Sequence, residues 1–91
     1  MDVAIISAGG VVPKEGLYDN ISLESYVKKK MIEIADDVYV VVDSSKFGKK
    51  LFFNFLATED IAKLFTDSGA ADEDLEILKD HGVDVFVVQK E

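Results

Sequence analysis

The chain has 91 residues, of which 48% are hydrophobic and 31% charged, and its net charge is -8. This length allows one domain with one core, and the apolar content argues against a disordered tail. No apolar run approaches the roughly 20 residues of a membrane-spanning helix, so no membrane association is expected. Cysteine is absent, which excludes disulfides and thiolate metal sites and is compatible with the cytoplasm, where we expect the protein.

The charge balance bears on the partners that the chain can bind. Asp and Glu number 18, whereas the strongly basic residues number 10 and are all lysine. DNA would be repelled on average, and arginine, which makes bidentate contacts to bases and phosphates, is missing. Two short basic runs, at 28–30 and 46–50, are interpreted as solvated faces. We therefore expect no DNA binding by this chain itself.

The first third of the chain predicts a strand, a loop and a helix. Residues 2–7 form an apolar run with β-branched side chains, which is typical of a short strand. Residues 8–21 contain three glycines and the only proline, so they predict a long loop. A helix is predicted from 22 to about 35, because apolar residues recur there every three or four positions. The residues expected to form its buried stripe are Leu23, Val27, Met31 and Ile34.

The rest of the chain alternates between strand-like and helical patterns. Residues 38–42 are all apolar or aromatic, as in a central parallel strand that is covered on both faces. The further predicted elements are a short strand at 51–56, a helical turn at 58–60, a strand at 63–66, a helix from Asp72 to Gly82 and a strand at 83–88. This order predicts one α/β domain over residues 1–91, with a mostly parallel sheet flanked by helices.

Candidate binding residues follow three of the predicted strands. In open parallel sheets, ligands bind at the carboxyl ends of the strands. The segments in that position are 7–10, 43–46 and 66–69. The middle segment is the strongest candidate, because Asp43, Ser45 and Lys46 bring together a carboxylate, a hydroxyl and an ammonium that can hold sugar hydroxyls or a phosphate. The alternative is a strand-ending turn whose Asp and Ser cap backbone amides.

Other kinds of site are not expected. One histidine and no cysteine argue against a zinc site and against a His-based catalytic triad. Neither G-x-G-x-x-G nor G-x-x-x-x-G-K-[ST] occurs, so Gly9 and Gly10 do not form a phosphate loop. We predict no catalytic residue, no metal and no cofactor.

The segment at 35–50, ADDVYVVVDSSKFGKK, resembles the most distinctive part of the sugar-sensing domain of DeoR-type transcription regulators. The neighbouring segments match the same family in order and spacing. Upstream, residues 2–11 follow the pattern D-x-A-x-x-x-x-x-G-V, and residues 24–32 follow E-x-x-V-K-x-x-M-I. Downstream, residues 60–67 follow D-I-x-x-x-x-T-D. The resemblance covers essentially the whole chain.

This resemblance implies a fold, a function and a set of binding residues. The sensor domains of the family resemble ribose-5-phosphate isomerase, so the chain is expected to form part of an isomerase-like, Rossmann-like sensor. Such a sensor binds a phosphorylated sugar or a related metabolite. The residues expected at the ligand are Asp43, Ser45, Lys46, Lys28, Gly9 and Gly10.

The resemblance also places the chain within a larger protein. In the family, a winged helix-turn-helix precedes the sensor, and the first half of the sensor carries a phosphate loop. Neither is found in this sequence, so residues 1–91 are expected to be the C-terminal portion of the sensor domain. DNA is then contacted only through the missing N-terminal domain, and the protein is expected to be a homo-oligomer.

Two alternative functions remain open on the sequence. One is a small enzyme that isomerises a sugar phosphate. Against it, residues 7–12 contain no carboxylate where the isomerase has an acid-rich loop. The other is an oligomerisation module, because part of a sheet exposes apolar surface and an unpaired edge.

Overall fold

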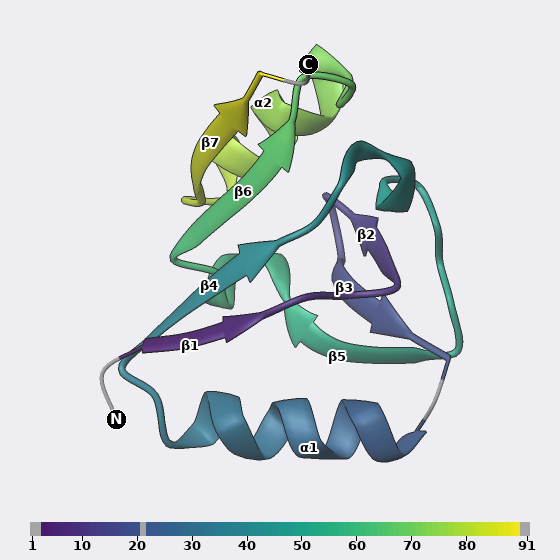
Figure 1. Cartoon of the computed structure of the whole chain (residues 1–91), viewed down its shortest axis with the longest axis vertical. Helices are drawn as coiled ribbons and strands as arrows, with labels where there is room; N and C mark the ends of the chain where they lie inside the picture. Colours follow the sequence, from purple (N-terminus) through teal and green to yellow (C-terminus); the bar gives the residue numbers. More distant parts are fainter. Residues whose placement is uncertain (1–2, 21, 90–91) are drawn as a thin grey trace.

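A computed structural model describes residues 3–20 and 22–89, which form two sheets, two helices and two 3-10 turns (Figure 1). The larger sheet consists of β1 (Val3–Ile6), β4 (Asp37–Val41), β6 (Lys63–Asp67) and β7 (Asp84–Val88), parallel and in this spatial order. The smaller, antiparallel sheet consists of β2 (Gly10–Val12), β3 (Gly16–Asp19) and β5 (Phe53–Ala57). The helical elements are α1 (Ser22–Glu33), η1 (Ser44–Lys46), η2 (Thr58–Asp60) and α2 (Asp72–Asp80). The predicted α/β fold with a parallel sheet and flanking helices is confirmed.

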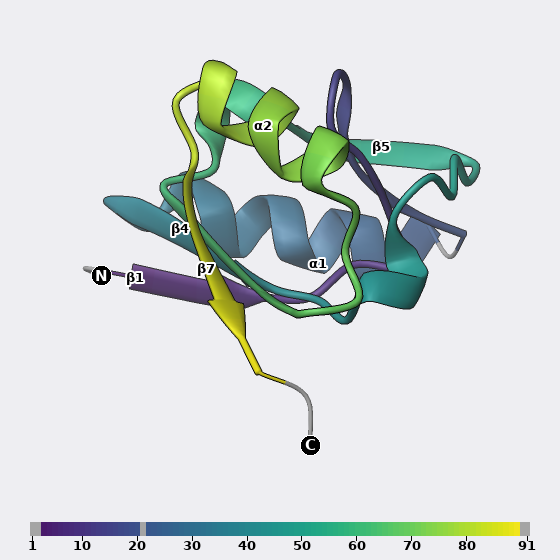
Figure 2. The ribbon, with the colours of Figure 1, turned by 90° about the horizontal axis from the view of Figure 1, so that it is seen from above.

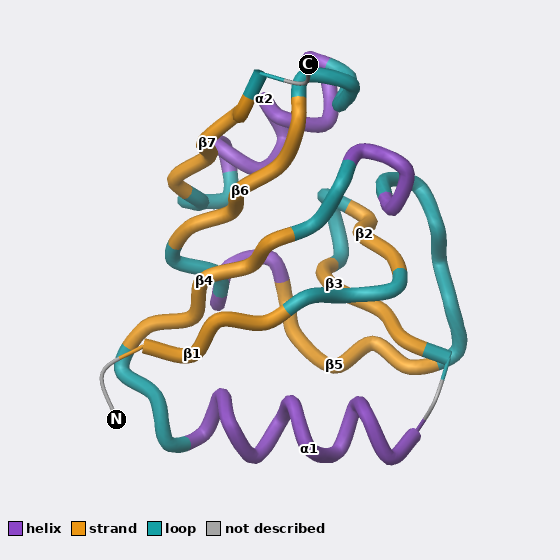
Figure 3. Tube along the Cα trace, viewed as in Figure 1, coloured by secondary structure: helices purple, strands orange, loops and turns teal. Residues whose placement is uncertain are grey.

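The core lies on one side of the large sheet. Val40 of β4 and Leu64 of β6 are fully buried there, together with Leu78 of α2 and Leu17 of the small sheet. These side chains belong to one cluster, so the small sheet and α2 share a single core with the parallel strands. Figure 3 shows how the chain leaves the large sheet after β1 and after β4 to build the small one.

The other side of the large sheet is uncovered among the described residues, contrary to the expectation that the central strand is covered on both faces. In Figure 2, α2 and β5 lie on one side of the large sheet, and no described element lies on the other. We call that second side the open face. Strand pairing assigns to it Val3, Ile5, Asp37, Tyr39, Val41, Lys63, Phe65, Asp67, Asp84, Phe86 and Val88. A continuous apolar run indicates that a strand can be buried on both faces, but it does not show whether a second layer is present to cover it.

The stripe predicted for α1 is also exposed rather than buried. Leu23 and Ile34 are 69% and 65% exposed, and Val27 and Met31 are exposed as well. The helix turns other positions inward, so that Ser25 is buried. Helical periodicity groups residues that share a face, but it does not say which face meets the sheet.

The prediction of a loop at 8–21 was wrong, because residues 10–19 form the hairpin β2–β3. The two strands have only three and four residues and are interrupted by Gly and Pro, so no alternation was visible. Gly16 has φ +143°, and a Cβ at this position would collide with the carbonyl oxygen of Leu56. The hairpin therefore depends on a glycine that the sequence reading assigned to a loop.

A β-bulge lies between β3 and β5. Leu17 is opposite Leu56 and Tyr18 is opposite Asn54, which leaves Phe55 as the extra residue of β5. Phe55 is only 4% exposed. The bulge thus brings a large aromatic side chain into the core where a regular ladder would have none.

The remaining predicted elements are confirmed with small shifts at their ends. The helical turn at 58–60 is η2, the second predicted helix begins at Asp72, and Gly82 follows its end with φ +91°. Asp2 and Ile21, at the limits of the predicted first strand and loop, lie outside the described residues. Within the described ranges, neither helix has the length and apolar character required to span a bilayer.

Replacing Gly16 by alanine should destabilise the protein far more than replacing Gly48 by alanine. Both glycines have positive φ, but a Cβ at Gly48 meets no atom within 4 Å. Gly48→Ala should cost about 1–2 kcal/mol for the left-handed backbone alone. Gly16→Ala adds a collision with backbone and should cost clearly more. Urea unfolding of both variants measures the difference, and equal losses would contradict this account of the hairpin.

Candidate functional site

Residues from four separated segments meet at the carboxyl ends of β1 and β4. They surround a hollow of about 360 Å³, which we call the strand-end hollow. Its lining residues are Ser7, Ala8, Gly9, Asp19, Lys28, Val41, Val42, Asp43 and Lys46. Four of the six predicted binding residues are among them, namely Gly9, Lys28, Asp43 and Lys46. The rule that ligands bind at the carboxyl ends of parallel strands thus led to a real concavity.

An ion pair forms one wall of the strand-end hollow. The Lys28 ammonium of α1 donates to Asp19 Oδ2 at 2.7 Å and to the Ser7 carbonyl oxygen at 2.7 Å. The backbone N–H of Gly9 donates to Asp19 Oδ1 at 2.9 Å. Both oxygens of Asp19 are therefore engaged, and its side chain is only 7% exposed. A buried carboxylate needs this compensation, because an unpaired charge away from water is costly.

Asp43 forms the opposite wall and also begins η1. Its Oδ1 accepts the backbone N–H of Ser45 at 3.0 Å and the Ser45 hydroxyl. The hydroxyl bond is the main cause that lowers the pKa of Asp43 from its ordinary value, and the Ser45 N–H and the Lys46 charge lower it further. The predicted alternative, a capping turn, is thus present. It engages one oxygen, and Oδ2 accepts no hydrogen bond from any described residue.

Lys46 supplies a positive charge that stays available for a ligand. It lines the hollow, and no carboxylate of the described residues lies within ion-pair distance of its ammonium. Asp19 and Lys28 neutralise one another, so Asp43 and Lys46 are the charged groups that remain for binding. A carboxylate accepts hydrogen bonds from hydroxyls, and an ammonium binds anionic oxygen.

Two predicted binding residues lie outside the hollow. Gly10 belongs to β2, where a Cβ would collide with the Lys49 carbonyl, so close backbone packing accounts for this glycine. Ser45 is exposed and directs its hydroxyl to Asp43. Its role in the structure is to hold the Asp43 carboxylate.

The third candidate segment, after β6, supports η1. Asp67 Oδ2 accepts the backbone N–H of Ser44 at 3.0 Å, and Asp67 Oδ1 accepts the N–H of Gly69 at 2.8 Å. These bonds hold the start of η1 against the end of β6. Asp67 therefore positions the Asp43 turn without lining the hollow.

Asp19 was missed by the sequence analysis. It was placed in the predicted loop, and no motif connects it to Lys28, nine positions later. The side chain reaches the site because it ends β3, whose pairing with β2 and β5 was not predicted. One available signal was an acidic residue just before a helix that carries three lysines.

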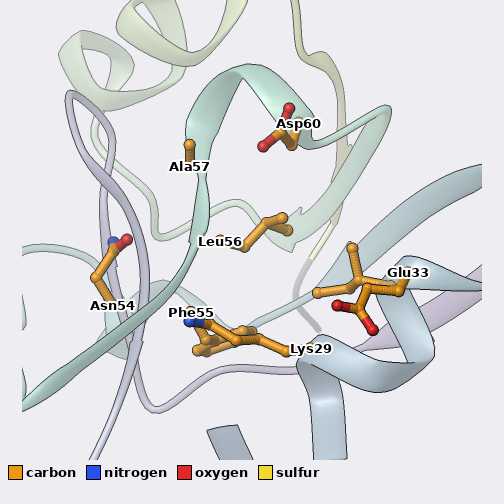
Figure 4. A pocket seen from close by; sticks show the side chains of 8 residues that line it. Lys29, Glu33, Asn54, Phe55, Leu56, Ala57 and Asp60 are labelled. Atoms are coloured by element: carbon orange, nitrogen blue, oxygen red, sulfur yellow. The ribbon is translucent and has the colours of Figure 1, made fainter. Parts of the chain in front are cut away.

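A second hollow of about 290 Å³ lies between α1 and β5 (Figure 4). Lys29 and Glu33 come from α1 and Asp60 comes from η2, around an apolar floor that includes Leu56. Two carboxylates and one ammonium give it a negative balance. None of the predicted site residues lines it, so the strand-end hollow remains the candidate site.

Comparison with known proteins gives a consistent set of relatives. A family model described as the DeoR C-terminal sensor domain matches residues 1–68. The chain is 32% identical over 83 residues to the uncharacterized HTH-type transcriptional regulator YulB of Bacillus subtilis (strain 168). It is 28% identical over 87 residues to a putative aga operon transcriptional repressor of Escherichia coli O157:H7. It is 31% identical over 84 residues to the HTH-type transcriptional regulator UlaR of Escherichia coli O1:K1 / APEC.

These matches cover most of this chain but a minor part of each relative. They span 91%, 96% and 92% of the chain, and 32%, 32% and 34% of the three regulators. The chain therefore spans about a third of the length of the curated relatives it matches.

Removing the Lys28 ammonium should destabilise the fold, because Asp19 would keep a buried charge without its counter-ion. Lys28→Met is expected to lose about 3 kcal/mol of unfolding free energy. The double variant Lys28→Met with Asp19→Asn should recover part of this loss, since the amide is neutral. Lys29→Met, at an exposed lysine of the same helix, is the control. Urea unfolding at neutral pH measures all four proteins, and equal losses at 28 and 29 would count against a structural ion pair.

Removing the Ser45 hydroxyl should raise the pKa of Asp43. The hydroxyl stabilises the charged carboxylate, so its loss makes protonation easier. Carbon-13 NMR titration of the Asp43 carboxyl group in Ser45→Ala tests this. Ser44→Ala is the matched control, because the Ser44 hydroxyl does not bond to Asp43 among the described contacts. An identical Asp43 titration in Ser45→Ala and the unmodified protein would show that the hydroxyl bond is absent in solution.

Proposed function

The chain belongs to the DeoR family and is an effector-binding part of its C-terminal sensor domain, and on this premise we propose that the strand-end hollow binds a phosphorylated sugar or a related metabolite. The observation that carries the proposal is the division of charge in the hollow. Lys28 and Asp19 are paired with one another, whereas Asp43 Oδ2 and the Lys46 ammonium remain available. These two groups can hold a polyhydroxylated, anionic ligand.

The charge balance of the hollow favours one orientation of such a ligand. Two carboxylates and two ammoniums line it, so their sum is zero. A phosphate group carries close to two negative charges at neutral pH and requires a positive surplus. We therefore place the hydroxyl-bearing end against Asp43 and a single anionic or polarised oxygen at Lys46. The remaining phosphate charge is assigned to another part of the full-length regulator.

In a full-length regulator, ligand binding would act on an N-terminal DNA-binding domain. A ligand that prefers one arrangement of the sensor shifts the population toward it, and a change in DNA affinity follows when the two domains are coupled. We propose that residues 1–91 correspond to the C-terminal portion of that sensor, that the assembly is a homo-oligomer, and that it works in the cytoplasm with its DNA. The names of the relatives as transcriptional regulators support this scheme.

We propose binding without turnover, against the alternative of a small isomerase. Asp19 brings a carboxylate to the hollow that the sequence analysis did not foresee, so the absence of acids at 7–12 no longer suffices as an argument. Both oxygens of Asp19 are occupied by Lys28 and Gly9, whereas a general base needs a free oxygen within reach of the substrate proton. Asp43, with its free Oδ2, is therefore the carboxylate of the hollow on which an isomerase would depend. Binding without turnover is supported by the relatives, which are named as transcriptional regulators. Conversion of an aldose phosphate to its ketose in a purified sample, lost in Asp43→Asn, would establish the enzyme instead.

A thermal melt with a panel of sugar phosphates, their unphosphorylated sugars and inorganic phosphate tests the proposed ligand. A ligand present at 100 times its Kd stabilises the folded chain by about 2.7 kcal/mol. For a domain of this size, that is a rise in Tm of roughly 10–20 °C. We expect a rise with one sugar phosphate and a smaller or no rise with the corresponding sugar and with phosphate alone.

Variants of the two free groups make the test specific. Lys46→Ala and Asp43→Asn should abolish the rise, whereas Lys79→Ala, which removes an exposed lysine on α2, should retain it. A rise in Tm that persists in both Lys46→Ala and Asp43→Asn would show that the ligand binds at another site. A cooperative melt that no ligand shifts would refute sensing by this part of the domain alone.

A further inference from the structure

Another hollow, of about 310 Å³, lies between α1 and the start of β5. We call it the aromatic hollow, and its lining residues are Ser25, Tyr26, Lys29, Phe52, Phe53 and Asn54. It shares no lining residue with the strand-end hollow, so a ligand here would be independent of the one proposed above. Its volume lies at the lower end of the range of small-molecule sites.

Aromatic side chains from two segments form the walls of the aromatic hollow. Tyr26 belongs to α1, whereas Phe53 begins β5 and Phe52 precedes it. Phe52 is 85% exposed, Tyr26 60% and Phe53 40%. A planar ring gains more from such walls than a flexible chain does, because it can stack on the exposed aromatic faces.

The charge of the aromatic hollow is positive. Lys29 lines it and no carboxylate does, and no described carboxylate lies within ion-pair distance of the Lys29 ammonium. The Lys30 ammonium lies 5.5 Å from the centre of the Tyr26 ring, but it is also paired with Glu33 at 3.6 Å. Lys29, which reaches the space between α1 and β5 (Figure 4), is therefore the charge that remains for an anionic group.

One polar group of the aromatic hollow lacks a partner. Ser25 is 6% exposed, and its hydroxyl makes no hydrogen bond within the described part of the chain. A buried hydroxyl without a partner costs free energy, and a ligand that accepts its hydrogen bond would remove this cost. Rotation about the Cα–Cβ bond can direct the hydroxyl toward the hollow that the residue lines. Ser25 also lies in the first turn of α1, where the helix dipole favours negative charge.

We propose that the aromatic hollow binds an aromatic carboxylate as a second ligand. Its ring stacks against Tyr26, Phe52 and Phe53. Its carboxylate accepts hydrogen bonds from the Lys29 ammonium and the Ser25 hydroxyl. A neutral ring would leave these two donors unpaired, and an aliphatic acid would leave the rings in water. For a ligand of about a dozen non-hydrogen atoms, we expect a dissociation constant of roughly 0.1–1 mM.

NMR titration of the nitrogen-15-labelled chain with 2-naphthoate tests the site. The amide resonances of residues 25–29 and 52–54 should shift and saturate. Two related probes each lack one feature of the ligand: 2-naphthamide lacks the charge and cyclohexanecarboxylate lacks the aromatic ring. Each should bind at least about fivefold more weakly than 2-naphthoate.

Variants of the two donors make the titration specific. Lys29→Met should weaken 2-naphthoate binding about tenfold and Ser25→Ala about fivefold. Ser25→Ala should not lower the urea midpoint, because its hydroxyl has no partner to lose, and this separates a binding role from a structural one. Lys79→Met, on α2, and Lys46→Ala, in the strand-end hollow, should keep the affinity of the unmodified chain.

Three results would overturn the proposal. Resonance shifts on β6 and β7 instead of α1 and β5 would place 2-naphthoate on the open face. Equal affinity for the three probes would show only apolar adsorption. Lys29→Met and Ser25→Ala chains that bind 2-naphthoate as tightly as the unmodified chain would show that the two donors do not meet the carboxylate.

Discussion

The contact between Lys28, Asp19 and Gly9 joins the parts on which the rest of the structure depends. Asp19 ends the small sheet, Lys28 comes from α1, and Gly9 follows the first strand of the large sheet. None of these parts is long: β2 and β3 together have only seven residues. The hydrogen bonds and the ion pair that compensate one buried carboxylate thus hold a short hairpin and a helix against the end of the parallel sheet. Apolar packing alone is limited there.

This arrangement separates charges that hold the structure from charges that can meet a ligand. The Lys28–Asp19 pair is satisfied internally, whereas Asp43 and Lys46 occupy a turn held by Ser45 and Asp67. Because the turn is fixed by backbone hydrogen bonds at its start, the carboxylate and the ammonium are preorganised before a ligand arrives. A sensor benefits from this, since less binding energy is spent on ordering its own residues.

The sequence allowed part of this description to be predicted, and the physical reasons for the rest are specific. The strand before Asp43, the helix from Asp72 and the stop at Gly82 followed from local patterns, and four predicted site residues do line one hollow. The hairpin was hidden because its strands are shorter than any alternation can reveal. The failure to predict Asp19 as a site residue followed from that error, since the position of Asp19 is set by pairing with distant residues. Periodicity did not predict the uncovered faces of α1 and of the large sheet, because it does not report whether a partner layer exists. Exposed apolar surface on the sheet was expected only under the alternative of an oligomerisation module.

The bulge at Phe55 has a consequence for how this segment can vary among related proteins. The extra residue changes the phase of β5, so that the residues before it face the opposite way from those in a regular ladder. A substitution there alters one side chain, whereas the loss of a single residue would restore a regular ladder, in which the residue before Leu56 points away from the core and the buried position of Phe55 is lost. Phe53 would remain opposite Asp19, so the loss would affect the core at the bulge itself. Homologous chains should therefore conserve the length of this strand more strictly than its composition, and alignments that place a gap within it should be treated as errors of alignment.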